Sequence, residues 1–234
     1  GTFMDGRLRL NAAYFDFDIE GFQSKWDNVT ARTYTATGPG PTSQVMGGIF
    51  TNNDATITGI DIDYAYVVNE NLTLGGGYTG NDSEYAAGSM GYANDPSYTG
   101  MAAAMRDVSG TPVNDAAESS LTFYLDHVVP ASWGGERYTR YNLSWRDERT
   151  NAINPDLKIK ALYLANIIVG WRSADEVWDA SFFVKNITDD VDITNIQGYY
   201  SDYSILGGDG LPSKFYAGNT NMGRQIGAQI VYNF

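Results

Sequence analysis

The chain has 234 residues, and its 28 acidic side chains against 15 basic ones give a formal net charge of -13, which argues against nucleic acid as a partner. It has no cysteine and a single histidine, His127, so disulfide scaffolds, thiol nucleophiles, cysteine zinc sites and histidine clusters are excluded. We therefore expect no enzymatic activity, no catalytic residue, no metal site and no cofactor.

The composition favours strands and turns. Aromatic residues make up 14% of the chain, beside 26 glycines and a charged fraction of only 18%. No segment approaches the ~18 consecutive apolar residues of a membrane-spanning helix, so the sequence excludes a helical membrane protein. A basic and apolar export leader is also missing at Gly1. We expect either that a leader has been removed or that the chain is a piece of a longer protein.

The first predicted strand follows an Asp5-Gly6 turn, and such a turn needs a strand on each side. Only residues 1–4 remain of the preceding strand, so we expect the chain to be cut from a larger barrel. Over residues 8–14 apolar and polar side chains alternate, but the phase flips after Tyr14, and Phe15, Phe17 and Ile19 are then the apolar ones. The flip indicates either a bulge or a strand that leaves its apolar surroundings.

The same period of two recurs along the rest of the chain. It predicts strands around residues 60–66, 72–78, 121–125, 141–145, 178–184 and 226–234. Residues 163–171 are apolar on both faces and count as a further strand, which makes about eight strands in all. The last strand is the most regular, with an apolar face of Ile226, Ala228, Ile230, Tyr232 and Phe234 and an opposite face of Gln225, Gly227, Gln229 and Asn233.

The predicted connections alternate in length along the chain. Long ones span residues 22–48, 80–118, 147–160 and 186–222, and short ones span 67–71, 129–136 and 173–176. Long loops at one end and short turns at the other are typical of a transmembrane β-barrel, and tyrosines and tryptophans near the strand ends resemble its interfacial girdles. The structural alternative is a soluble β-sandwich with aromatic core residues.

Several segments resemble TonB-dependent outer-membrane receptors, in the order in which that family has them. Residues 183–190, Phe-Val-Lys-Asn-Ile-Thr-Asp-Asp, resemble the lysine-asparagine-leucine segment near the end of these receptors. Before it come Gly170-Trp171-Arg172 and a short turn, and after it a long loop and a last strand that ends in an aromatic residue. Residues 55–63 and 5–13 resemble two earlier strands of the same barrels.

The resemblance covers the whole chain and implies its fold and function. The fold class is all-β: residues 1–234 would be the C-terminal part of one antiparallel transmembrane β-barrel of about 22 strands, with its plug domain and coupling box absent. The parent would be a receptor in the bacterial outer membrane that takes up a scarce nutrient such as a ferric siderophore, cobalamin or an oligosaccharide. Its partners would be outer-membrane lipid, the barrel assembly machinery, that nutrient and, through the missing N-terminal part, the energy-coupling TonB complex.

Three groups of candidate site residues follow. The apolar set of the last strand, Ile226, Ala228, Ile230, Tyr232 and Phe234, resembles the signal that the assembly machinery recognises. Strand alternation selects lumen-lining candidates, namely Asp61, Asp63, Arg140, Arg146, Asp179 and Lys185. The last long loop offers ligand candidates, namely Asp189, Asp190, Asp192, Tyr199, Tyr200 and Tyr203. The spacing of Asp190, Asp192 and Thr194 only faintly resembles a calcium loop, because Asn195 stands where that loop has glycine.

Two other functions stay open at this point. One is a self-contained small outer-membrane barrel with an adhesive or structural role. The other is a secreted carbohydrate-binding β-domain.

Overall fold

The computed structural model describes the backbone of residues 1–26, 30–35, 38–44, 49–94, 103–113, 116–150, 158–202 and 212–234. Side chains are described for the same residues except 25–49, 92–106 and 195–217. Within the described ranges all regular elements are β-strands. No helix among these residues is long and apolar enough to cross a membrane.

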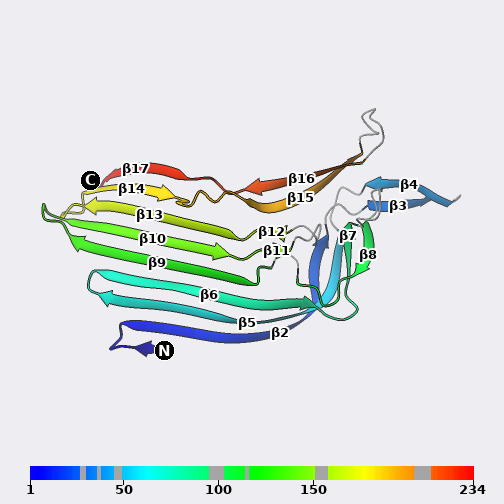
Figure 1. The fold of residues 1–234 in the computed structure, drawn as a ribbon, viewed down its shortest axis with the longest axis horizontal. Coiled ribbons are helices and arrows are strands. Elements are labelled where there is room, and N and C mark those ends of the chain that lie inside the picture. The colour runs from blue at the N-terminus through cyan, green and yellow to red at the C-terminus, as the bar shows by residue number, and fades with distance from the viewer. Residues whose placement is uncertain are drawn as a thin grey trace.

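One nine-stranded antiparallel sheet forms the body of the molecule (Figure 1). Its order is β1 (Thr2–Phe3), β2 (Leu8–Trp26), β5 (Ile49–Asn69), β6 (Leu72–Tyr85), β9 (Ser119–Pro130), β10 (Glu136–Arg146), β13 (Leu162–Arg172), β14 (Trp178–Lys185) and β17 (Gln225–Tyr232). The predicted eight strands and the preceding stub, β1, are therefore confirmed. The sheet is open, because β1 pairs only with β2 and β17 pairs only with β14.

Short turns gather at one end of the sheet and long connections at the other, as predicted (Figure 1). The long connections also contain strands that the sequence did not predict. These are the hairpins β3 (Thr30–Thr35) with β4 (Gly38–Gln44), β7 (Met90–Asn94) with β8 (Ala103–Asp107), β11 (Arg149–Thr150) with β12 (Lys158–Ile159), and β15 (Ile193–Asp202) with β16 (Pro212–Thr220). A hairpin outside the apolar band needs only its backbone hydrogen bonds, so it leaves no alternation of polarity in the sequence.

The register divides the sheet into two faces of opposite polarity, since residues paired across antiparallel strands point to the same side. The apolar face includes Leu10, Ile62, Leu74, Leu125, Leu143, Ile167, Val169, Phe182 and Ile230. The polar face includes Asn11, Asp63, Thr73, Asp126, Arg140, Asn142, Ser181 and Gln229. Each face is continuous across the eight long strands. The sequence predicted the two faces of each strand separately, but not how the faces of different strands align.

The phase flip in β2 is not a bulge at Tyr14. Pairing with β5 runs without a shift from Leu8 to Ile19, and the register shift comes only between Ile19 and Phe22, beside Gly21 with its φ of +68°. Of the two explanations for the flip, the bulge is therefore wrong. Phe15, Phe17 and Ile19 lie on the side of the polar face, where β2 approaches the long loops.

A small buried core lies at the long-loop end, where the connection after β6 folds against β2 and β5. Its buried members are Ala55, Tyr85, Val108 and Val113, with Phe22 packed beside them. The hydroxyls of Ser24 and Tyr85 hydrogen-bond at 2.7 Å inside this core. This cluster fixes the base of the long connection between β6 and β9 on the sheet.

Aromatic rings of the polar face lie over glycines of the neighbouring strand. The cross-strand pairs are Phe15 with Gly59, Tyr124 with Gly75, Tyr138 with Gly170 and Phe183 with Gly227. A methyl group at Gly170 would lie only 2.3 Å from Cζ of Tyr138, so the ring occupies the space that any other side chain would fill. Such pairing covers the glycine backbone and helps to fix the register.

Candidate functional site

All the predicted lumen-lining residues lie on the polar face of the sheet. Two of them, Asp61 and Asp63, lie on β5, and each accepts a hydrogen bond from a side chain of an adjacent strand. Thr79 donates a hydrogen bond of 2.8 Å to Oδ1 of Asp61, and Asn11 donates one of 2.8 Å to Oδ2 of Asp63. Their carboxylates are therefore held by the neighbouring strands of the sheet.

Asp179 is the centre of a larger polar network near the short turns. The Tyr138 hydroxyl donates to Oδ1 of Asp179 at 2.6 Å, and the Arg172 guanidinium lies 3.3 Å from its Oδ2. Arg172 also lies 3.3 Å from Oε1 of Glu136. Strand alternation predicted only Asp179 as part of this network. Tyr138, Arg172 and Glu136 become its neighbours through the register of three strands, which a single sequence does not reveal.

Tyr138→Phe tests this network. The change keeps the ring over Gly170 and removes the hydroxyl that bonds to a half-buried carboxylate, so we expect it to lower the free energy of unfolding by about 1.5 kcal/mol. Urea unfolding of the full-length protein in detergent measures the effect. Tyr124→Phe is the matched control, because the Tyr124 ring covers Gly75 in the same way and the described residues show no hydrogen bond from its hydroxyl. Equal losses in both variants would contradict the network.

The other predicted lumen residues also face neighbouring groups. Nε of Arg140 lies 3.5 Å from Oδ1 of Asp126, and its guanidinium lies 5.2 Å from the centre of the Tyr138 ring. Nζ of Lys185 lies 5.4 Å from the centre of the Phe183 ring. Arg146, at the long-loop end of β10, is half-buried on the same face. The polar face thus carries charges of both signs, and Arg140 and Arg172 are paired with carboxylates.

Asn186 anchors the last long loop. It is 4% exposed, and its φ of +52° lies in the left-handed region that asparagine tolerates better than most residues. Its Nδ2 donates to the carbonyl oxygens of Asp190 and Met222 at 3.1 and 3.0 Å, and its Oδ1 accepts from the Asp190 amide at 3.1 Å. One side chain therefore ties the start of the loop to its end. This physical role belongs to the most recognisable segment of the sequence, yet Asn186 was not among the predicted site residues.

The aspartates that follow Asn186 are also held in place, mostly by groups at the base of the loop. Oδ1 of Asp189 accepts a 2.7 Å hydrogen bond from the Arg224 amide, and Oδ2 of Asp190 accepts one of 2.9 Å from the Tyr163 amide. Asp192 accepts from the Ile193 amide at 2.7 Å and lies 3.8 Å from Nζ of Lys160. These contacts explain the acidic residues as anchors of the loop base, and contact with a ligand stays a prediction for them.

Two of the loop tyrosines, Tyr199 and Tyr200, lie in β15 of the β15–β16 hairpin. In the register, Tyr199 faces Phe215 and Tyr200 faces Lys214, but their side chains are outside the described residues, as is the whole of Tyr203. Among the described residues, no group of three or more His, Cys, Asp or Glu side chains is arranged to hold a metal ion.

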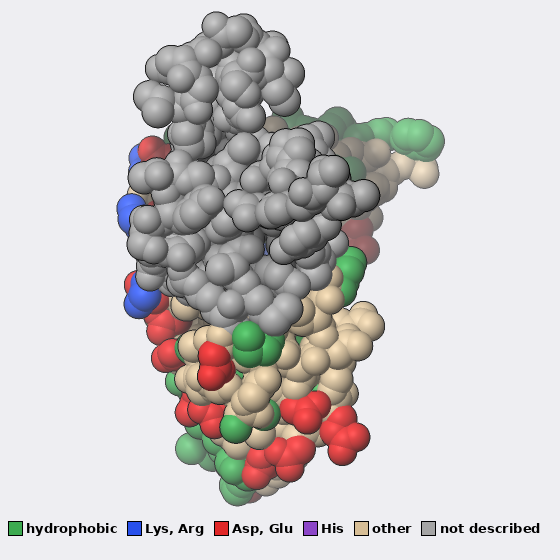
Figure 2. Space-filling model, turned by 90° about the vertical axis from the view of Figure 1, so that its right-hand side faces the viewer, with side chains coloured by type: hydrophobic (Ala, Val, Ile, Leu, Met, Phe, Trp, Pro, Cys, Tyr) green, Lys and Arg blue, Asp and Glu red, His purple; other side chains and the backbone are tan. Residues whose placement is uncertain are grey.

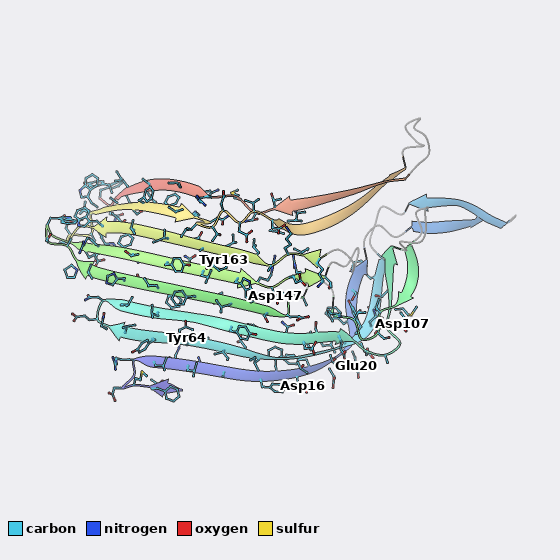
Figure 3. All side chains as sticks on the ribbon, in the orientation of Figure 1. Asp16, Glu20, Tyr64, Asp107, Asp147 and Tyr163 are labelled. Carbon is cyan, nitrogen blue, oxygen red and sulfur yellow. The ribbon has the colours of Figure 1, made fainter. Side chains whose placement is uncertain are left out.

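Negative charge gathers toward the long-loop end of the sheet. Figure 3 shows Asp16, Glu20, Asp107 and Asp147 there, and Figure 2, viewed from that end, shows more acidic than basic side chains on the described surface. The Ser109 hydroxyl, and then its amide, hold the pKa of Asp107 below its usual range. A hydrogen bond to Glu148 raises the pKa of Lys158. Both groups therefore stay charged over a wider pH range than usual.

The last strand places its predicted apolar set beside that of β14. In the register, Ile226 faces Val184, Ile230 faces Ala180 and Tyr232 faces Trp178. The rings of Tyr232 and Trp178 lie 4.7 Å apart between centres, and Phe234 is fully exposed beside Tyr232. This arrangement forms an aromatic cluster at the short-turn end. Recognition of the strand by the assembly machinery stays a prediction.

An antiparallel sheet that is apolar on one face and polar on the other, with short turns at one end and long loops at the other, is the wall of a transmembrane β-barrel. Residues 2–187 match the family model described as TonB dependent receptor-like, beta-barrel. The chain belongs to this family. A search among curated proteins found no match.

Solved structures of related barrels share the fold. The siderophore receptor PiuA from Acinetobacter baumannii superposes with a TM-score of 0.62 at 14% identity, over 98% of this chain and 26% of that one. The ferric yersiniabactin uptake receptor FyuA from Yersinia pestis gives 0.57 at 12% identity, over 100% and 36%. The copper transporter OprC gives 0.57 at 12% identity, over 97% and 30%. The chain thus spans between a quarter and two fifths of the length of these proteins.

Proposed function

We propose that this chain forms the C-terminal wall of a receptor that imports a ferric siderophore across the bacterial outer membrane. The division of the sheet into one apolar and one polar face carries the proposal, because a polar solute needs a wet interior behind a lipid-facing surface. The choice of substrate class is supported by PiuA and FyuA, which are siderophore or siderophore-chelate receptors. Cobalamin and oligosaccharides are the other nutrients that fit the family resemblance.

In this function the two ends of the sheet have different tasks. The short turns would face the periplasm and the long loops the outside. The polar face, with its charge pairs around Arg140 and Asp179, would line the lumen and face the plug supplied by the N-terminal part of the receptor. That part would also couple transport to the TonB complex, and the apolar face would meet outer-membrane lipid.

Ligand capture would fall to the loop beyond its anchored base. The carboxylates of Asp189, Asp190 and Asp192 already accept hydrogen bonds from backbone amides, so they have less freedom to bind a ligand. Tyr199 and Tyr200 lie in β15, away from the anchored base, and together with Tyr203 they are the better candidates for contact with an incoming chelate.

Uptake of radioactive iron tests the proposal. Deleting the gene for the full-length protein should abolish accumulation of ⁵⁵Fe from at least one of a panel of ferric siderophores, and a plasmid copy should restore it. Cells without a functional TonB complex should show the same loss. Normal uptake of every ferric siderophore, with lost uptake of cobalamin or an oligosaccharide, would overturn the substrate class. Unchanged uptake of all three nutrient classes would overturn the transport function.

The self-contained small barrel finds no support in this structure, because the two edge strands of the sheet, β1 and β17, do not pair with each other.

A further inference from the structure

The apolar face has an open hollow of about 700 Å³ next to the short turns. Small side chains form its floor, namely Thr139, Ala180 and Ala228. Larger side chains surround them, namely Trp133, Trp171, Phe182 and Ile230. Since large and small residues alternate across strands β10 to β17, the hollow is built by the register and lies on the opposite side of the sheet from the Asp179 network.

A single cation stands at the rim of this hollow. Arg137 points to the apolar face in register with Val129 and Trp171, and it is the only Lys or Arg on that face among strand residues with described side chains. Its guanidinium lies 5.7 Å from the centre of the Trp133 ring. Among the described residues, no carboxylate pairs with it, whereas Arg140 and Arg172 on the polar face both have acidic partners.

The turn that carries Trp133 is held in place beside Arg137. The indole Nε1 of Trp171 donates a hydrogen bond of 2.8 Å to the carbonyl oxygen of Gly134. The Ala131 amide donates one of 2.9 Å to the carbonyl oxygen of Gly135 across the same turn. Trp133 nevertheless stays 64% exposed. The hollow thus has a fixed aromatic wall with an exposed ring and a positively charged rim at the end of the apolar band.

We propose that this hollow binds one anionic glycerophospholipid of the periplasmic leaflet. Its phosphate would accept charge-assisted hydrogen bonds from Arg137, whose planar guanidinium suits phosphate oxygens. An acyl chain would lie over Thr139, Ala180 and Ala228, where it covers apolar surface that larger side chains would otherwise fill. Tryptophan rings at the level of the lipid headgroups match this placement. The inference rests on the proposed function for one point, the position of the short turns at the periplasmic side.

Native mass spectrometry of the full-length protein in detergent, titrated with phosphatidylglycerol, tests the site. We expect one lipid to stay bound at low lipid concentration, and Arg137→Gln to weaken its binding about tenfold. Arg7→Gln is the matched control, because Arg7 is an exposed arginine of another short turn that does not line the hollow. It should leave binding unchanged. Equal binding by wild type and Arg137→Gln would overturn the proposal.

Two further experiments identify the bound lipid. Ala180→Phe should fill the floor of the hollow and displace the lipid while Arg137 remains. Heat-modifiable migration in gels shows whether this variant folds. If it does not fold, the comparison of Arg137→Gln with Arg7→Gln decides whether the site exists. Phosphatidylglycerol should bind more tightly than phosphatidylcholine, and millimolar inorganic phosphate should not displace it. Equal binding of the two lipids, or displacement by phosphate, would overturn an anionic phospholipid as the ligand. A protein that imports its substrate yet fails these tests would refute this inference and leave the proposed function intact.

Discussion

Ile167→Arg should lower the stability of the folded barrel by about 2 to 4 kcal/mol. Ile167 lies on the apolar face at the middle of β13, halfway between Tyr163 and Trp171, and pairs with Tyr141 and Val184. A guanidinium there would stand near the middle of the bilayer, too far from either interface to reach water easily. Urea unfolding of the full-length protein in lipid vesicles, followed by tryptophan fluorescence, measures the loss.

Ser144→Arg is the control for Ile167→Arg. Ser144 is an exposed residue of the polar face in β10, and it pairs with Thr122 and Leu164. If that face lines a wet lumen, the same arginine should change the stability by less than about 0.5 kcal/mol. Equal losses from the two substitutions would show that the faces do not separate lipid from water, and the assignment of the sheet as a barrel wall would fall.

Asn186→Ala should cost about 3 to 4 kcal/mol, because it removes the hydrogen bonds of a buried side chain to the Met222 carbonyl and the Asp190 amide and places alanine at a positive φ. The loss should be local as well as global. Proteolysis of the folded protein should cut between residues 187 and 222 faster than in the wild type, because Asn186 joins both ends of that loop.

Asn186→Gly separates the two causes. Glycine adopts the left-handed backbone freely but makes no side-chain hydrogen bond, so we expect it to recover about 1 kcal/mol relative to alanine. Asn233→Ala is the exposed control, since the Asn233 side chain donates one bond, 3.0 Å long, to the carbonyl of Glu176. It should cost at most about 1 kcal/mol. A loss at Asn186 no larger than at Asn233 would contradict its role as the anchor of the loop.

Strand number, strand order and family were predictable because they depend on local patterns. The alternation in residues 60–66 and 226–232 records which side chains share the apolar face, and the Asp5-Gly6 turn, with its φ of +86° at Gly6, requires the β1 stub. The hairpins of the long connections were missed for the opposite reason. Both sides of β15 and β16 lie outside the apolar band, so no contrast in polarity marks them.

The contacts of the site were the least predictable part. Asp179 was selected from its strand, but its partners Tyr138 and Arg172 come from two other strands, and a shift of one residue would have turned them to the opposite face. Asn186 was part of a recognised motif, while its contacts with Met222 depend on how a long loop returns to the sheet. Both sets of contacts depend on how segments far apart in the chain align, and this alignment cannot be predicted from a single sequence.

The glycines beneath the aromatic rings of the polar face let those rings lie flat against the sheet. A tyrosine or phenylalanine that stands upright would reach far into the interior, whereas Tyr124, Tyr138 and Phe183 lie across Gly75, Gly170 and Gly227. The rings therefore add only a thin layer to the polar face, and in the proposed barrel they would project less far into the lumen. Filling these glycines would lift each ring off the sheet, so the relief of the polar face depends on residues that carry no side chain at all.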